Sequence, residues 1–133
     1  MSIEQRNLQV VAQLGERWNS GDHEGVLELY HDEIVMTASP EWLDAGPWVG
    51  KHQVAQNQAD WASAWDTIEM AAERVEAAGN RIVLIGSWLS RGAASGAGST
   101  TPIVIVFTLE EGLIKGFDWS WEADDALRLA GVG

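Results

Sequence analysis

Apolar side chains recur at helical spacing near the start of the chain. Val11, Leu14 and Trp18 lie three or four positions apart and would share one face of a helix over about residues 3–19. Ser2, with a glutamine three positions later, has the pattern of a capping box that begins such a helix. The sequence therefore predicts a long first helix, which ends before a glycine that suits its C-terminus.

The next segment predicts two further helices with a strand and a loop between them. Asp22 is placed to cap a short helix that runs through Tyr30, and the partly β-branched residues 34–38 favour a strand. Residues 40–50 follow as a loop, and a third helix is expected over about 51–65. One face of this helix would carry Val54, Gln58, Trp61 and Trp65.

Residues 67–78 fit two different structures. Their many alanine and glutamate residues have helical propensity. The turn signal Gly79-Asn80 comes next, however, and leads into residues 81–91, which have the composition of a strand. A strand over about 68–77 would pair antiparallel with that segment. We favour the strand, and the family resemblance given below weighs more in this choice than propensity does.

The rest of the chain predicts hairpins. The small residues at 92–101 would connect the preceding strand to another at 102–109, and a turn at 110–112 would lead to a last strand over about 113–122. Residues 124–130 are expected to form one or two helical turns. Three helices followed by four antiparallel strands predict an α+β domain in which the helices cover one face of the sheet.

Length and charge narrow the possible functions. We expect one domain over residues 1–133. Twenty acidic and eight basic residues give a net charge of −12, which disfavours nucleic acids and anionic membranes as partners. The absence of cysteine excludes disulfides and Cys-ligated metals. No apolar segment approaches the roughly 18 residues of a membrane span, and the first residues do not resemble a secretory signal, so a cytoplasmic location is expected.

The chain contains eight tryptophans, and several fall at matched positions. Trp61 and Trp65 are four apart on the third helix, and Trp119 and Trp121 are two apart on the last strand, so each pair would share a face. Trp88 interrupts an otherwise aliphatic strand. Each indole can bury roughly 150–250 Å², more bulk than a small core needs from one residue type. We therefore expect a cavity lined with indole rings.

Residues 17–35, RWNSGDHEGVLELYHDEIV, resemble the start of the nuclear transport factor 2-like fold. The shared pattern is a long helix ending in Asn-x-Gly-Asp, a short helix, an aromatic residue and a strand. Gly50, the turn at 79–80 and the closing Ala126-Leu127 follow in the family's order. The resemblance spans nearly the whole chain and is closest to the SnoaL-like branch, which includes polyketide cyclases, and to the ketosteroid isomerases.

This resemblance implies a cone-shaped, curved, mainly antiparallel sheet with three N-terminal helices that enclose a pocket, a cystatin-like α+β roll. It also implies a small apolar ligand and a homodimer formed through the outer face of the sheet. Because this fold supports many chemistries, it does not by itself assign a reaction.

Two activities of similar proteins are excluded residue by residue. The phenol of the ketosteroid isomerases falls on Leu14, their general base on Ala38, and the acid of their oxyanion hole on Ile105. The catalytic Arg–Asp pair and the remaining aspartate of limonene epoxide hydrolases, which look like the same fold, fall on Gly86, Trp88 and Trp119. We expect neither activity in this chain.

Strand alternation predicts which side chains face the cone. If Trp88 and Ile105 face it, Val104 and Val106 lie on the outer face, which is apolar enough to favour a dimer that covers it. Trp42 and Trp48 lie on the expected loop and would form a lid or a ligand platform. The expected pocket residues are Leu14, Trp18, Met36, Ala38, Trp42, Trp48, Val54, Gln58, Trp61, Trp65, Trp88, Ile105, Phe117, Trp119 and Trp121.

Three residues are candidates for catalysis. Gln58 would orient a ligand carbonyl or hydroxyl, or would be a buried amide satisfied by the protein. Asp118 would suit proton transfer if it were inside the cone, but it alternates with two cone-facing aromatic residues, which favours the outer face near Arg91. His52 is expected near the mouth of the cone. The histidines lack metal-ligand spacing, so neither a metal nor a cofactor is expected.

These patterns lead to three functional hypotheses. The first is a cofactor-independent, non-redox enzyme of the isomerase, cyclase, dehydratase or hydrolase type that acts on a hydrophobic or aromatic substrate. The second is a binding or carrier protein for such a ligand without catalysis. The third is a structural dimer whose cavity is filled by its own side chains. We favour the first, because members of the resembling family are often enzymes.

Overall fold

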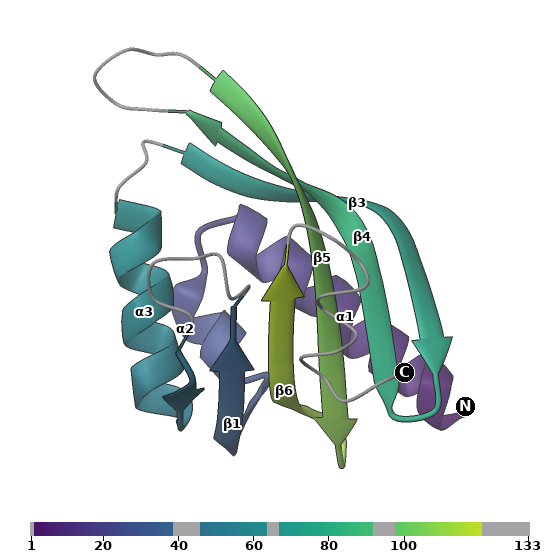
Figure 1. Cartoon of the computed structure of the whole chain (residues 1–133). Helices are drawn as coiled ribbons and strands as arrows, with labels where there is room; N and C mark the ends of the chain where they lie inside the picture. The colour runs from purple at the N-terminus through teal and green to yellow at the C-terminus, as the bar shows by residue number, and fades with distance from the viewer. Residues whose placement is uncertain (1, 39–45, 64–66, 92–97, 121–133) are drawn as a thin grey trace.

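A computed structural model describes residues 2–38, 46–63, 67–91 and 98–120 of the chain. In these residues a six-stranded curved sheet has the order β2-β1-β6-β5-β4-β3. Figure 1 shows α1 crossing one face of the sheet while α3 lies beside β1 and β2. This arrangement confirms the predicted α+β fold with helices on one face of the sheet.

The three helices in the described part of the chain are α1 (Ile3–Asn19), α2 (His23–Leu27) and α3 (Lys51–Ser63). The predicted capping box is present at the start of α1, where the Ser2 hydroxyl accepts from the backbone N–H of Gln5 and the Gln5 side chain accepts from the backbone N–H of Ser2. The prediction that the second helix runs through Tyr30 is wrong. It ends at Leu27, and Tyr30 begins a strand.

The strands are β1 (Tyr30–Thr37), β2 (Trp48–Val49), β3 (Thr67–Ala78), β4 (Arg81–Arg91), β5 (Gly98–Glu110) and β6 (Leu113–Ser120). Strands β3 to β6 form the predicted antiparallel hairpins. Two features were not predicted. Strand β1 pairs parallel with β6, and Trp48 belongs to a short strand beside β1 rather than to a loop. The expected helical turns at 124–130 lie outside the described residues.

Residues 67–78 form strand β3, as favoured over the helix. The segment pairs with β4 from Thr67↔Arg91 to Ala78↔Arg81, so its backbone hydrogen bonds join the sheet ladder. Met70 points inward and is buried, while Glu69 on the other face is exposed. Pairing along the full strand, together with burial of one face, therefore overrides the helical propensity of alanine and glutamate.

The sheet bends where β3 carries a bulge. The β3–β4 register shifts between Ala72 and Arg74, and Gly86 of β4 pairs with Ala72 at this point. A Cβ atom on Gly86 would lie 2.1 Å from the carbonyl oxygen of Ala71, so only glycine permits this approach of the two backbones. A bulge bends and twists its strand. The bulge and Gly86 thus curve β3 and β4 over the helices (Figure 1).

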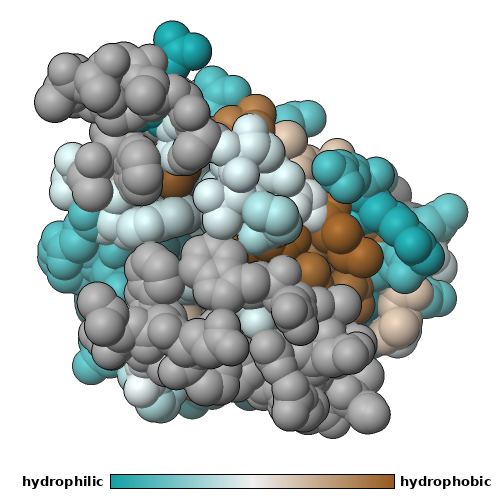
Figure 2. All heavy atoms as spheres, turned by 45° about the horizontal axis from the view of Figure 1, so that its top comes forward, coloured by the Kyte–Doolittle hydropathy of each residue, from teal (hydrophilic) through white to brown (hydrophobic). Residues whose placement is uncertain are grey.

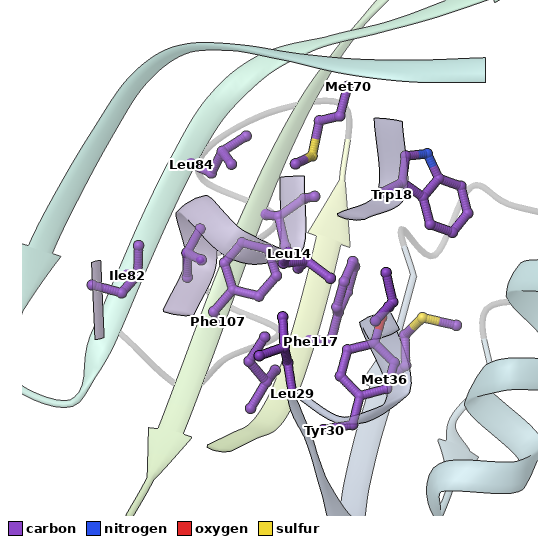
Figure 3. Close-up of a cluster of buried hydrophobic side chains, with 14 of the residues drawn as sticks. Leu14, Trp18, Leu29, Tyr30, Met36, Met70, Ile82, Leu84, Phe107 and Phe117 are labelled. Carbon is purple, nitrogen blue, oxygen red and sulfur yellow. The ribbon is translucent and has the colours of Figure 1, made fainter. Parts of the chain in front are cut away.

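The core fills the space between the concave face of the sheet and α1. Leu14 and Trp18 of α1 meet Met70, Phe107 and Phe117 from three strands, as Figure 3 shows. The rings of Phe107 and Phe117 meet edge to face with centroids 5.0 Å apart. One apolar face of α1 and one face of each strand therefore share a single interior, which is what the two hydrophobic periodicities predict.

The outer face of the sheet has its own apolar cluster, which is centred on Val104 and Val106 with Val83 and Ile85 beside it. Val104 is 5% exposed and Val106 0%, so these two side chains are buried within the single chain.

On the side of the molecule drawn in Figure 2, hydrophobic surface gathers mainly in one patch bordered by hydrophilic surface. Within the described residues, no helix is long and apolar enough to cross a membrane.

We predict that Gly86→Ala lowers the free energy of unfolding by about 2–3 kcal/mol, because the added methyl group meets backbone that cannot move without breaking the bulge. Urea denaturation measures the change. Gly15→Ala is the matched control, since its added methyl group meets only the flexible end of Met70 at 3.4 Å and alanine favours a helix. Equal effects of the two substitutions would contradict this role of Gly86.

Candidate functional site

A cavity opens between the concave side of the sheet, α1 and α3. It offers about 80 Å³ to the centres of water-sized molecules, several times the roughly 10–15 Å³ that one water needs. The side chains that line it are Leu14, Trp18, Tyr30, Met36, Trp48, Asn57, Gln58, Trp61, Met70, Trp88, Ile103, Phe117 and Trp119. They come from α1 and α3 and from all six described strands, so only the complete fold builds this cavity.

Indole rings form much of the wall. Trp88 lies between two others: its ring centroid is 5.8 Å from that of Trp18 and 4.8 Å from that of Trp61, the latter edge to face. Trp18 in turn stacks on the ring of His23, with centroids 5.0 Å apart and an angle of 12° between the planes. Such aromatic pairs add attraction beyond the area they bury. The arrangement gives flat apolar surfaces suited to flat apolar molecules.

One hydrogen-bonded pair supplies most of the polarity. The Tyr30 hydroxyl donates to Gln58 Oε1 at 2.8 Å, and Gln58 Nε2 lies 3.6 Å from the sulfur of Met36. Figure 3 shows Tyr30 and Met36 side by side in the buried cluster. Burial raises the pKa of Tyr30 well above its usual value, and the bond to Gln58 offsets this only in part. The hydroxyl therefore stays protonated at neutral pH and can donate or accept a hydrogen bond.

The structure places most of the expected pocket residues around this cavity. Those that line it are Leu14, Trp18, Met36, Trp48, Gln58, Trp61, Trp88, Phe117 and Trp119. Three others, Ala38, Val54 and Ile105, are buried but are not part of the lining. The remaining three, Trp42, Trp65 and Trp121, lie outside the described residues, and so does the proposed lid at Trp42.

Four lining residues are absent from the expected pocket set: Tyr30, Asn57, Met70 and Ile103, the last of which shares its face of β5 with the expected Ile105. Tyr30 was placed at the end of a helix, although an aromatic residue beside the β-branched segment 34–38 was a signal for a longer strand. Met70 follows from the alternation of β3 once that segment is taken as a strand. Asn57 is next to Gln58 on α3, and no spacing rule distinguished the two.

The other two catalytic candidates do not reach the cavity. His52 is exposed in the first turn of α3 and is not among the lining residues. Asp118 is 8% exposed, and its carboxylate accepts from the Thr37 hydroxyl at 2.5 Å. Its neighbours Phe117 and Trp119 line the cavity while Asp118 does not, as the parity argument expected. The positive charge that lowers the pKa of Asp118 belongs to Arg81, whereas the sequence analysis expected Asp118 to lie near Arg91.

In the ranges that the structure describes, no group of three or more His, Cys, Asp or Glu side chains is placed to hold a metal ion. The charged side chains there lie outside the cavity lining, so the lining described above bears no formal charge at neutral pH. The site can exclude water, stack a ring and form a few hydrogen bonds.

The family model for the SnoaL-like domain matches residues 11–117 of this chain. No protein in a search of curated sequences matches it significantly. The matched segment runs from α1 into β6 and contains every described residue that lines the cavity except Trp119.

Solved structures share the whole fold at low sequence identity. An NTF2-like protein of unknown function from Burkholderia pseudomallei is 22% identical with a TM-score of 0.78, covering 97% of this chain and 98% of that one. A putative SnoaL-like polyketide cyclase from Jannaschia is 18% identical with a TM-score of 0.78, covering 90% and 87%. A Mycobacterium tuberculosis protein in complex with estradiol-17β-hemisuccinate is 20% identical with a TM-score of 0.76, covering 90% and 96%. At these identities the likeness shows the fold alone.

The environment of Asp118 predicts how stability depends on pH. Burial raises the pKa of its carboxyl group, while the Thr37 hydroxyl and the charge of Arg81 lower it to a smaller extent. A carboxyl whose pKa is higher in the folded state binds more protons there than in the unfolded chain. Its contribution to stability is therefore present at low pH and is lost as pH rises through the folded-state pKa.

We predict that Asp118→Asn raises Tm at neutral pH, because the amide has no charge to desolvate and its oxygen still accepts a hydrogen bond from the Thr37 hydroxyl. Below neutral pH, the stability of this variant should decrease less steeply as the pH rises than that of the parent. Thermal melts between pH 4 and pH 7 give the comparison. The exposed Asp60→Asn serves as the control for net charge. An Asp118→Asn variant that melts below the parent at neutral pH would refute this account.

Proposed function

This chain belongs to the SnoaL-like domain family, and we propose that residues 1–133 form a single domain that takes a small molecule into the cavity. The small molecule is neutral and hydrophobic or aromatic. The protein converts it without a cofactor and without redox chemistry. The observation that carries this proposal is the lining itself, in which five tryptophans share the wall with the hydrogen-bonded pair of buried Tyr30 and partly buried Gln58. Pockets with apolar walls and a few convergent polar groups are typical of small-molecule sites.

The lining favours a ligand without charge. None of the described lining side chains is ionised at neutral pH, so a buried charge on the ligand would have no opposite charge to pair with there. The net charge of −12 further disfavours anions. A similar solved structure holds estradiol-17β-hemisuccinate, whose flat steroid skeleton supports a ligand of that shape, whereas its carboxylate would have no opposite charge in the described lining of this chain.

The reaction that fits these groups is an isomerisation, cyclisation, dehydration or hydrolysis. The Tyr30 hydroxyl stays protonated and donates its one proton to Gln58 Oε1, so its oxygen can accept a hydrogen bond from a ligand, while the Gln58 Nε2 amide group can donate one to a ligand oxygen. A dry cavity also strengthens such a bond and orients the substrate. Ketosteroid isomerase chemistry is not proposed, because the positions of its polar groups carry Leu14, Ala38 and Ile105.

A binding or carrier role is the second candidate. It is favoured by the same scarcity of acids and bases, since the described lining offers only Tyr30 as a titratable group. The two candidates differ in what Tyr30→Phe does with a ligand that binds. An enzyme should lose turnover by about 10²-fold or more while affinity changes little. A carrier should show no turnover in the parent or in Tyr30→Phe, and the substitution should change only the dissociation constant of the ligand.

We further propose a homodimer formed through the outer face of the sheet. Leu89 on the outer side of β4 is 39% exposed, and the apolar cluster around Val106 lies on the same face of the sheet. The burial of Val104 and Val106 within one chain means that a partner is not required to cover them. Light scattering should give twice the chain mass of 14.5 kDa, and a monomer would rule the dimer out.

We predict that tryptophan fluorescence is quenched or blue-shifted, with micromolar dissociation constants, by neutral polycyclic, terpenoid or aromatic molecules, because five tryptophans line the cavity. Titration of a panel of such ligands measures this, with Trp88→Leu as a variant that reshapes the site. A charged analogue of each ligand that binds is the matched control and should bind at least tenfold more weakly. No response to any member of the panel would favour a filled cavity with no ligand and would overturn the proposed function.

A further inference from the structure

A second cavity lies behind the first, between α2 and α3. Its volume is about 150 Å³, compared with about 80 Å³ for the first cavity. Its apolar lining includes Val26, Leu27, Ala55 and Ala59, with His23 and Glu24 contributed by the first turn of α2. Nothing in the proposed reaction uses this space.

Two side chains, Trp18 and Gln58, line both cavities and therefore form the wall between them. Gln58 is anchored, because its Oε1 accepts from the buried Tyr30 hydroxyl at 2.8 Å. Trp18 is not anchored in this way. Its indole nitrogen is buried and has no hydrogen-bond partner among the residues that the structure describes.

Trp18 is held in place by packing alone, without a hydrogen bond from its indole nitrogen. One face of its ring stacks on His23, which is itself exposed to solvent. Figure 3 shows Trp18 at the margin of the buried cluster, with its nitrogen on the ring edge turned away from Tyr30 and Met36. A buried N–H without a partner costs free energy. Rotation of this side chain breaks no hydrogen bond and allows the N–H to meet water or a ligand oxygen.

We propose that the two cavities are the halves of one elongated binding site, and that Trp18 swings aside to admit an apolar extension of the ligand into the second half. The ligand class is then a neutral aromatic head, held in the first cavity, with an alkyl or aryl tail between α2 and α3. This inference rests on the proposed binding of a neutral apolar molecule in the first cavity. It adds the shape of that molecule and assigns Trp18 as the residue that selects it.

A series of phenyl ketones with growing alkyl chains, from acetophenone to decanophenone, tests the proposal. In the unmodified protein each added methylene should tighten binding by about fourfold until the second cavity is full. Ala55→Phe fills that cavity, so in this variant the gain should stop after the first few methylenes, while acetophenone binds as before. Ala55→Ser changes the same residue without filling the space and should behave as the parent does.

The outcomes separate the two proposals. If acetophenone and its homologues all fail to bind, the proposed function fails and this inference with it. If the short ketones bind and chain length has the same effect in Ala55→Phe and Ala55→Ser, the elongated site is wrong while the proposed function stands. Should Ala55→Phe not fold, Ala59→Phe gives the same test at a more exposed position on α3.

A second measurement reports on Trp18 directly. With ¹⁵N-labelled indoles, the Trp18 signal is assigned by its absence in Trp18→Phe. Decanophenone should move this signal and change its exchange with solvent, whereas acetophenone should leave its exchange unaltered. If both ligands leave the Trp18 signal in place, the tail does not pass this residue and the proposal is refuted.

Discussion

The close approach of β3 and β4 at Gly86 is the constraint on which the cavity depends. At this point the register shifts by a bulge, and the Ala71 carbonyl occupies the space where any side chain of residue 86 would be. Strands that bend here wrap over α1, so that Met70 and Trp88 face the same interior as Leu14 and Trp18. A flat sheet would pack against α1 along a line and would leave no enclosed volume.

The interior that results is rich in aromatic rings and poor in hydrogen-bonding groups. This balance decides what the site can do. Tyr30 and Gln58 satisfy each other, and burial keeps the phenol protonated, so the site offers an oriented neutral hydroxyl rather than a base. Asp118 lies between two lining residues in sequence, but it faces the other side of the sheet and accepts a hydrogen bond from the Thr37 hydroxyl. Any catalysis here must come from orientation, desolvation and a neutral donor.

Trp18 connects the fold to the choice of ligand. It belongs to the core through Trp88, to the surface through His23, and to both cavities as their shared wall. Its N–H is one of two buried side-chain polar groups without a partner in the described residues, the other being the Asn7 Oδ1 atom, and it contrasts with the satisfied Tyr30–Gln58 pair. Buried polar groups without partners are rare in folded proteins, and this one lies at the boundary between two cavities, which is why we assign Trp18 the role of the movable wall.

The sequence alone determined the elements whose signals are local. The spacing of Val11, Leu14 and Trp18 and the Ser2 capping box located α1, and strand alternation separated Trp119 from Asp118, because side-chain direction follows from periodicity. Only the tertiary structure decided the rest. Tyr30 lies in the cavity because β1 pairs parallel with β6, where the partners Thr37 and Asp118 are 81 residues apart, and Trp48, which the sequence placed on a loop at the pocket, lies in β2 because this strand pairs with β1. Such pairings are long-range contacts: the sequence around Tyr30 contains a local signal for a longer strand, but neither it nor the sequence around Trp48 specifies the partner strand.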